Sequence, residues 1–314
     1  MKNLNDDLLE LVEKFTYSIF NSEDIIEDLQ SLGYTENKYS FSEYPSIIIY
    51  LSFIYKNKNF NFDDLKILTE LCNYIEKLIN EIKNTKYIDI SLCYGLTGIA
   101  YCLKYTFYKT GKFQNILLNI EKTLVDLVNQ KLDEVLQIKD TVYESDYDVI
   151  EGLASPALYL MDCENNDYHD TIERLLRYFV LLLSRKDNSI HALITPEKMV
   201  TENLSKKYPN GYINLSLSHG IASILYILAF AQVRGFNVYK LRESVEFGLK
   251  LYMDSIVEYK LNGKNYKFFS SRLLLPNNKL ETANNLSWCY GSLGIINILF
   301  DIAELHNDSN IMGS

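Results

Sequence analysis

The sequence predicts an all-α protein. The 314 residues include only 5 Pro and 13 Gly, which favours helices over a turn-rich sandwich or barrel. Hydrophobic residues make up 47% and charged residues 23%, a globular composition that excludes wholesale disorder. Amphipathic stretches with helical spacing alternate along the chain with almost wholly apolar ones. We therefore expect two layers of helices, with the apolar helices packed inside.

Helical periodicity places the individual elements. The opening helix is predicted from Leu8, Val12, Phe15 and Ile19, which share one face. Further amphipathic helices are expected at residues 62–82, 113–136, 171–183 and 238–259. Apolar inner helices are expected at residues 47–55, 99–108, 156–161, 221–233 and 295–303.

A related short motif precedes each apolar segment. Its first glycines are Gly95, Gly152, Gly220 and Gly291, at intervals of 57, 68 and 71 residues, and Pro45 takes the corresponding place in the first copy. An interval of this size fits a helical hairpin repeated along the chain. We expect the inner helices to begin just after Pro45 and near each of these glycines, where a tight turn and close backbone approach favour small residues.

Charge, hydropathy and cysteine usage limit the classes of partner and the cellular location that we expect. The chain has 31 Lys+Arg against 41 Asp+Glu, a net charge of −10, and no basic stripe, which argues against a nucleic-acid partner. No apolar run reaches the ~18–20 residues of a membrane span, and the acidic amphipathic N-terminus is not a signal peptide. Five widely spaced cysteines fit reduced thiols. We expect a cytoplasmic protein without a transmembrane segment.

Four motif segments carry the residues capable of chemistry. They are Ser-Leu-Cys-Tyr-Gly-Leu-Thr-Gly at 91–98, Tyr-Asp-Val-Ile-Glu-Gly at 147–152, Asn-Leu-Ser-Leu-Ser-His-Gly at 214–220 and Ser-Trp-Cys-Tyr-Gly at 287–291. Together and in this order they resemble the lanthionine synthetase C family, the cyclases of lanthipeptide biosynthesis, over residues 40–305. The resemblance implies a single domain over 1–314 with an α/α toroid, a double-layer barrel of seven helical hairpins, of which about five are visible here.

The resemblance also implies the reaction. Peptide cysteine thiols would add to dehydroalanine or dehydrobutyrine in a dehydrated precursor peptide, forming lanthionine or methyllanthionine rings. A thiol with a pKa of about 8.5 is mostly protonated at neutral pH, so the family uses zinc to generate the thiolate. The enolate left by the addition must then be protonated. Further expected partners are the dehydratase and the transporter of a synthetase complex, through which the protein would associate with the membrane.

Three residues are assigned to catalysis by the resemblance. His219 would protonate the enolate, because a His pKa near 6.5 suits proton transfer, although a lone histidine usually belongs to the core. Asp148 would orient or deprotonate a catalytic group, with a helix N-cap as the alternative. Tyr290 would donate a hydrogen bond to the enolate oxygen, with packing beside Trp288 as the alternative.

The family's zinc ligands are only partly present. The family holds zinc with the Cys of a Trp-Cys-Tyr-Gly motif and with a Cys-His pair in a later Cys-His-Gly motif. Cys289 matches the first ligand and would otherwise read as a buried hydrophobe. The later pair is absent, and the only candidate ligand after Cys289 is His306. We therefore expect a chain that is incomplete at its C-terminus by two hairpins, with one of three zinc ligands, and that purifies without stoichiometric zinc.

The remaining cysteines and histidines are expected to be structural. We expect Cys93 to be structural although it precedes a Tyr-Gly pair, and we expect core positions for Cys72, Cys102 and Cys163 and solvated positions for His169 and His191. Residues 185–212 are expected to form the longest irregular stretch, bordering a cavity or meeting a leader peptide.

Two other functions stay open. The first is a truncated, catalytically impaired cyclase-like protein that acts as a peptide-binding or partner-binding module. The second is another α/α-toroid enzyme, such as a glycosidase, which would need paired carboxylates on opposing elements. Asp148 and Glu151 lie in one repeat, and no opposing carboxylate is identifiable.

Overall fold

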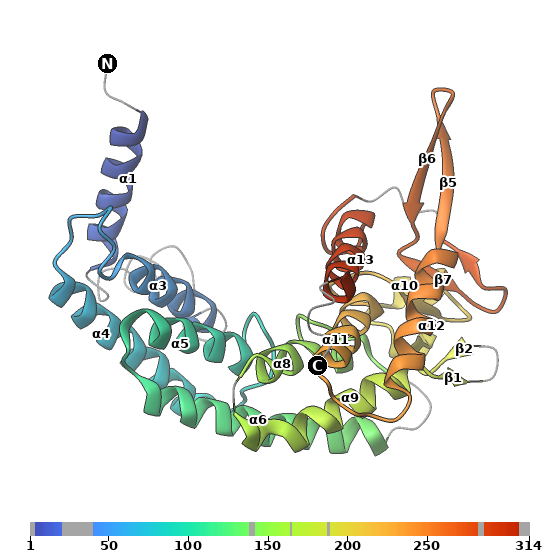
Figure 1. Ribbon diagram of the computed structural model, residues 1–314, viewed down its shortest axis with the longest axis horizontal. Helices are drawn as coiled ribbons and strands as arrows, with labels where there is room; N and C mark the ends of the chain where they lie inside the picture. Colours follow the sequence, from blue (N-terminus) through green and yellow to red (C-terminus); the bar gives the residue numbers. More distant parts are fainter. Residues whose placement is uncertain are drawn as a thin grey trace. The chain divides into compact units, whose positions relative to one another are not determined.

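A computed structural model describes residues 4–20, 40–137, 142–163, 165–186, 189–281 and 286–307. The chain divides into two compact units, Met1–Leu124 and Val125–Ser314. Helices dominate both units, as predicted (Figure 1). Within the described part of the chain, no helix combines the length and the apolar character that crossing a bilayer requires.

The first unit is built from helix pairs. It contains α1 (Leu4–Ile19), α3 (Ser40–Ile54), α4 (Asp64–Asn84) and α5 (Leu96–Thr110), and α6 (Gln114–Gln137) contains the boundary between the units. Helix α3 packs against both α4 and α5. A buried hydrogen bond of 2.9 Å from Ser52 to Thr106 joins α3 to α5.

Two sequence-based expectations for this unit are wrong. Helix α3 begins at Ser40, so Pro45 lies inside the helix rather than before it. Because proline has no backbone N–H, the helix lacks one hydrogen bond there. Cys72 is exposed rather than in the core. The buried face of α4 runs through Leu71 and Ile75, and Cys72 projects away from it.

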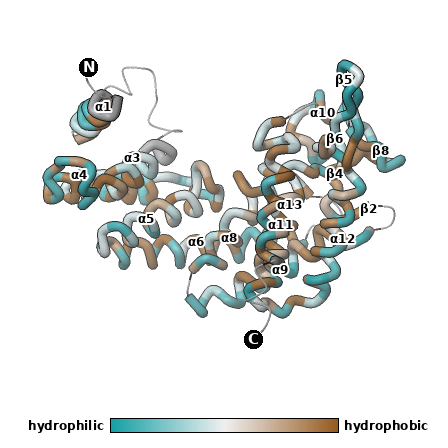
Figure 2. Tube along the Cα trace, turned by 45° about the horizontal axis from the view of Figure 1, so that its top comes forward, coloured by the Kyte–Doolittle hydropathy of each residue, from teal (hydrophilic) through white to brown (hydrophobic). Residues whose placement is uncertain are grey.

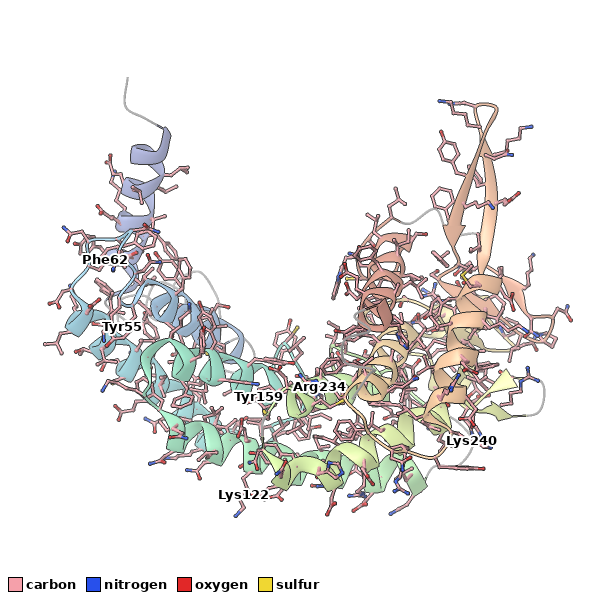
Figure 3. All side chains as sticks on the ribbon, in the orientation of Figure 1. Tyr55, Phe62, Lys122, Tyr159, Arg234 and Lys240 are labelled. Atoms are coloured by element: carbon pink, nitrogen blue, oxygen red, sulfur yellow. The ribbon has the colours of Figure 1, made fainter. Side chains whose placement is uncertain are left out.

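The second unit is organised around α11 (Ile221–Val233). This helix packs against α8 (Ala154–Met161), α9 (His169–Leu183), α12 (Leu241–Asp254) and α13 (Ser292–Asn307). Figure 2 shows α11 as a predominantly hydrophobic segment. In Figure 3 the labelled Tyr159 and Arg234 mark α8 and the C-terminal end of α11.

The layers of this unit follow the hydropathy pattern. Nine of the 13 residues of α11 are buried and none is exposed, whereas α9 and α12 bury one face, through residues such as Leu175 and Val245. The expected alternation of apolar inner helices with amphipathic helices is therefore confirmed here. Gly248 on α12 allows the close approach, because a Cβ atom there would lie 2.7 Å from Leu225 on α11.

Short strands were not predicted from the sequence. Strands β3 (Leu193–Ile194), β4 (Tyr212–Asn214), β7 (Arg272–Leu274) and β8 (Lys279–Leu280) form an antiparallel sheet in the order β3-β4-β7-β8. Strands β1 (Arg185–Lys186) and β2 (Ser189–Ile190) form a second, two-stranded sheet. The expected irregular stretch 185–212 thus contains β1 to β3, a 3-10 turn (Pro196–Lys198) and α10 (Glu202–Lys207).

A third sheet is the hairpin of β5 (Ile256–Leu261) and β6 (Lys264–Phe269). The helix expected at 238–259 therefore ends at Asp254, because Val257 and Tyr259 alternate with polar residues, as is typical of a strand. Asn262 and Gly263 form the turn with φ of 50° and 77°, the combination of a type I′ hairpin.

Candidate functional site

Three motif loops of the second unit meet at Ser218. The Ser218 N–H and hydroxyl both donate to the carbonyl oxygen of Cys289, at 3.2 and 3.1 Å. The Ser218 carbonyl accepts from the N–H of Val149 at 3.2 Å. Ser218 is fully buried. One residue therefore joins the loops that carry Asp148, His219 and Tyr290.

Asp148 orients His219. One carboxylate oxygen of Asp148, Oδ2, lies 2.5 Å from Nδ1 of His219. The other, Oδ1, accepts the backbone N–H groups of Ile150, Glu151 and Gly152 at 3.1, 2.6 and 2.8 Å. The side chain follows α7 (Glu144–Tyr147) and is buried. It thus caps the turn that leads to α8 and leaves Nε2 of His219 as the nitrogen available for proton exchange.

His219 is held in its protonated form more readily than a free histidine. The hydrogen bond that His219 donates to Asp148 raises the pKa of His219 most, and the carboxylates of Glu144 and Glu151 raise it further, while burial acts in the opposite direction. The His219 side chain is 25% exposed, so a reactant can reach the ring. The arrangement supplies an oriented proton donor near neutral pH.

Tyr290 lies against His219. The two rings stack with their centroids 5.3 Å apart and an interplanar angle of 26°. Burial, followed by the negative charge of Glu144, raises the pKa of Tyr290. The phenol therefore stays protonated at neutral pH and can donate a hydrogen bond.

Glu144 and Asn214 support this site and were not singled out from the sequence. Glu144 Oε1 accepts from the Tyr212 hydroxyl at 3.0 Å and from Asn214 Nδ2 at 2.7 Å. Asn214 Oδ1 in turn accepts the N–H of Ser216 at 3.0 Å, which fixes the start of the loop to His219. Asn214 is the first residue of the motif at 214–220, so the sequence could have indicated its role. Glu144 lies outside the motifs, and nothing in the sequence pointed to it.

Gly220 provides space rather than an unusual backbone angle. Its φ of −121° is open to any residue, but a Cβ atom would lie 2.5 Å from the backbone nitrogen and oxygen of Ser216. Gly294, three residues after Gly291, would place a Cβ atom 2.1 Å from the Trp288 carbonyl oxygen. Close approach of the backbone, as expected, therefore explains these small residues.

The described donor groups do not make a three-ligand metal site. Cys289 is half-buried in the loop beside Tyr290. No three His, Cys, Asp or Glu side chains of the described residues gather closely enough to hold an ion. His306 on α13 has Nδ1 2.9 Å from the carbonyl oxygen of Ile302. This donor set does not fit the three-ligand zinc site of the resemblance.

The other candidate residues belong to other segments of the chain. Cys93 belongs to the first unit and is exposed. His169 begins α9, is 56% exposed and lies 3.4 Å from Glu173. His191 is half-buried.

A family model described as "Lanthionine synthetase C-like protein" matches residues 44–313. The chain belongs to the lanthionine synthetase C-like family. It is 28% identical over 273 residues to the nisin biosynthesis protein NisC of Lactococcus lactis subsp. lactis, an alignment that covers 84% of this chain and 62% of that protein. Among solved structures it resembles nisin cyclase, with a TM-score of 0.76, 22% identity and coverage of 95% of this chain and 73% of that one.

These similarities settle the fold class and the family. The lanthionine synthetase C-like fold confirms the predicted α/α-toroid class, and all three motif loops lie inside the matched range. The chain spans less than two thirds of the length of the curated relative. The roles of Asp148, His219, Tyr290 and Cys289 are therefore proposals.

Proposed function

We propose that this chain is a lanthipeptide cyclase that adds peptide cysteine thiols to dehydroalanine or dehydrobutyrine. The products are lanthionine and methyllanthionine, and the substrate is a dehydrated precursor peptide. The observation that carries the proposal is the oriented pair of Asp148 and His219 with Tyr290 stacked on it, on loops within the range of the family match.

The reaction requires one bond between sulfur and carbon and one transferred proton. The peptide thiolate attacks the β-carbon, the C–S bond forms, and the π electrons move onto the α-carbon and its carbonyl as an enolate. Protonation of the α-carbon completes the thioether. About a few per cent of an ordinary thiol is ionised at neutral pH, which supplies some thiolate from solution.

His219 is the proposed proton donor to the α-carbon. The imidazolium would release its Nε2 proton, and the neutral ring would recover a proton from the next thiol or from water. Because Asp148 raises the pKa of His219, the donor form persists at a pH where more of the substrate thiol is ionised. Asp148 thereby acts as the orienting residue.

Tyr290 is the proposed stabiliser of the enolate oxygen. Its raised pKa keeps the hydroxyl protonated, and a hydrogen bond that strengthens as negative charge develops lowers the barrier. The stacking of the two rings fixes the position of the Tyr290 phenol relative to the His219 imidazole.

Zinc remains part of the proposal only through Cys289, the ligand that the resemblance assigns. When bound, zinc would supply a deprotonated, nucleophilic substrate thiol. Because the described residues do not complete a ligand set, no step above depends on the metal.

The test is thioether formation on a synthetic peptide with one dehydroalanine and one cysteine. Free thiols would be alkylated at intervals and counted by mass spectrometry, with and without added zinc. We expect the protein to accelerate thiol loss above the uncatalysed rate. Binding of the peptide without any acceleration would instead support the alternative, a cyclase-like binding module.

A further inference from the structure

The β5–β6 hairpin exposes an apolar face. Figure 1 shows it extending away from α11 and α12. Tyr259 pairs with Tyr266 across the hairpin, and the two residues are 38% and 41% exposed. Phe268 lies on the same face, with ring centroids 6.5 Å from Tyr259 and 6.4 Å from Tyr266. Two-stranded hairpins are marginal alone in water, so this exposed aromatic face indicates a partner.

The outer edge of β6 is free to pair with another strand. The hairpin is its own two-stranded sheet, and no described strand pairs with β6 apart from β5. The backbone N–H of Phe269 faces outward, because it donates to the hydroxyl of Ser292 at 3.0 Å rather than to a carbonyl of β5. By the alternation of antiparallel pairs, the backbone groups of Asn265 and Lys267 face the same way.

This edge leads to the candidate site. Ser292 is the first residue of α13 and lies three positions after Cys289. The Ser292 hydroxyl also lies 3.4 Å from the Phe269 carbonyl oxygen, which ties the base of β6 to the motif loop. A strand added along Asn265 and Lys267 would therefore be directed along β6 toward the loop of Cys289 and Tyr290.

The excess of positive charge on the hairpin favours an acidic partner. It carries Lys260, Lys264 and Lys267 against the single acidic residue Glu258, within a chain of net charge −10. An added strand would place every second side chain beside the aromatic face. Apolar residues suit these positions, and acidic residues suit the lysines.

We propose that the outer edge of β6 is a strand-addition site for an extended, acidic segment of the substrate peptide, with apolar residues at alternate positions. This inference rests on the proposed cyclase function for the identity of the peptide. Main-chain hydrogen bonds along the edge would supply affinity, and the aromatic face and lysines would supply selectivity. The edge would bring a segment of the peptide toward the reacting groups.

The test compares two matched proline variants by fluorescence anisotropy. The probe is a short fluorescein-labelled peptide that alternates leucine with glutamate, and its control carries lysine in place of glutamate. Lys267→Pro removes an outward N–H of β6, whereas Glu258→Pro removes its counterpart on β5. The two residues are cross-strand partners, and each substitution also breaks their 3.5 Å ion pair. Both prolines occupy outward-facing edge positions, where a strand tolerates them.

We expect Lys267→Pro to weaken binding of the glutamate probe by about tenfold and Glu258→Pro by less than about twofold. Lys267→Gln, which keeps the N–H, should retain more affinity than Lys267→Pro. Hydrogen exchange on the unaltered protein supplies a readout that does not depend on folding of a variant. The probe should slow exchange at Asn265 and Lys267 but not at Glu258 and Lys260.

Equal losses in the two proline variants, no loss in either, or protection on β5 alone would overturn the proposal. So would a dimer that Lys267→Pro abolishes, because the edge would then pair with a second copy of the chain. Asp148→Asn should bind the probe normally. If thioether formation fails while probe binding follows the β6 edge, only the cyclase proposal falls. If thioether formation succeeds while Lys267→Pro binds fully, only the edge proposal falls.

Discussion

Ser218 holds the carbonyl of Cys289 with both its backbone N–H and its hydroxyl. The residue after Ser218 is His219 and the residue after Cys289 is Tyr290, so this pair of bonds sets the spacing of two groups in the proposed mechanism. The N–H of Val149, in the Asp148 loop, donates to the carbonyl oxygen of Ser218 and so links a third loop to this residue. Two backbone hydrogen bonds and one side-chain hydroxyl bond therefore join the three loops at Ser218.

Ser218→Ala tests the contribution of that hydroxyl. Loss of a buried hydrogen bond costs about 1 kcal/mol, and the Cys289 loop should become less constrained. Trp288 is the only tryptophan of the chain and is adjacent to Cys289, so its fluorescence should shift. Ser205→Ala, which removes an exposed hydroxyl contact on α10, is the control. An unchanged spectrum and unchanged stability in Ser218→Ala would contradict a structural role for the Ser218 hydroxyl.

Gly220→Ala tests whether space or backbone angle matters at the mouth of α11. The added Cβ would lie 2.5 Å from the Ser216 backbone, so the loop before His219 must move. We expect a larger loss of unfolding free energy than in Gly235→Ala, where φ is +80° but nothing lies within 4 Å of the added Cβ. The strain at Gly235 should cost about 1 kcal/mol. Denaturant unfolding would measure both variants, and equal losses would refute the packing explanation.

Asp148→Asn tests the electrostatic control of His219. The hydrogen bond that His219 donates to Asp148 is the largest cause of the raised His219 pKa, so weakening this bond should lower that pKa. Two-dimensional NMR of the histidine rings would follow the titration. Thioether formation requires a protonated His219 and an ionised thiol, so the rate passes through a maximum as pH rises. In Asp148→Asn the apparent pKa of the rising limb should move to lower pH, and the maximal rate should fall. A His219 pKa that is the same in both proteins would rule out this coupling.

Zinc binding tests the assignment of Cys289. With no three-ligand group among the described residues, we expect the 314-residue chain to hold well below one zinc ion after dialysis. Cys289→Ala should remove most of any weak zinc binding, and Cys93→Ala should not. Elemental analysis that finds one tightly held ion per chain would require ligands that the described residues do not reveal.

Helical periodicity predicted the helices and their layers well because an apolar face repeats over many residues, as in α9 and α12. The strands were missed because most are only two or three residues long and leave no alternation to detect. The β5–β6 hairpin followed an amphipathic helix directly, so Val257 and Tyr259 were absorbed into the helical pattern.

The site was predictable where its residues belong to recognisable motifs. Asp148, His219 and Tyr290 lie far apart in the sequence, and the structure brings them together. Ser218 and Glu144 were missed because their importance depends on bonds to distant residues, Cys289 in one case and Tyr212 in the other. A buried serine and a carboxylate on a four-residue helix carry no such information in a single sequence.

The rate of thioether formation by His219→Asn is the most direct test of His219 as the proton donor. His219 is proposed to protonate the α-carbon, and loss of a general acid typically slows a reaction about 10²–10⁴-fold. The rate would be measured by thiol alkylation and mass spectrometry on the dehydroalanine peptide, with His169→Asn, at the exposed first residue of α9, as the matched control. We expect a loss of at least about 100-fold in His219→Asn and an unchanged rate in His169→Asn. A His219→Asn protein that forms thioether at the rate of the unaltered chain would contradict the proposed role of His219.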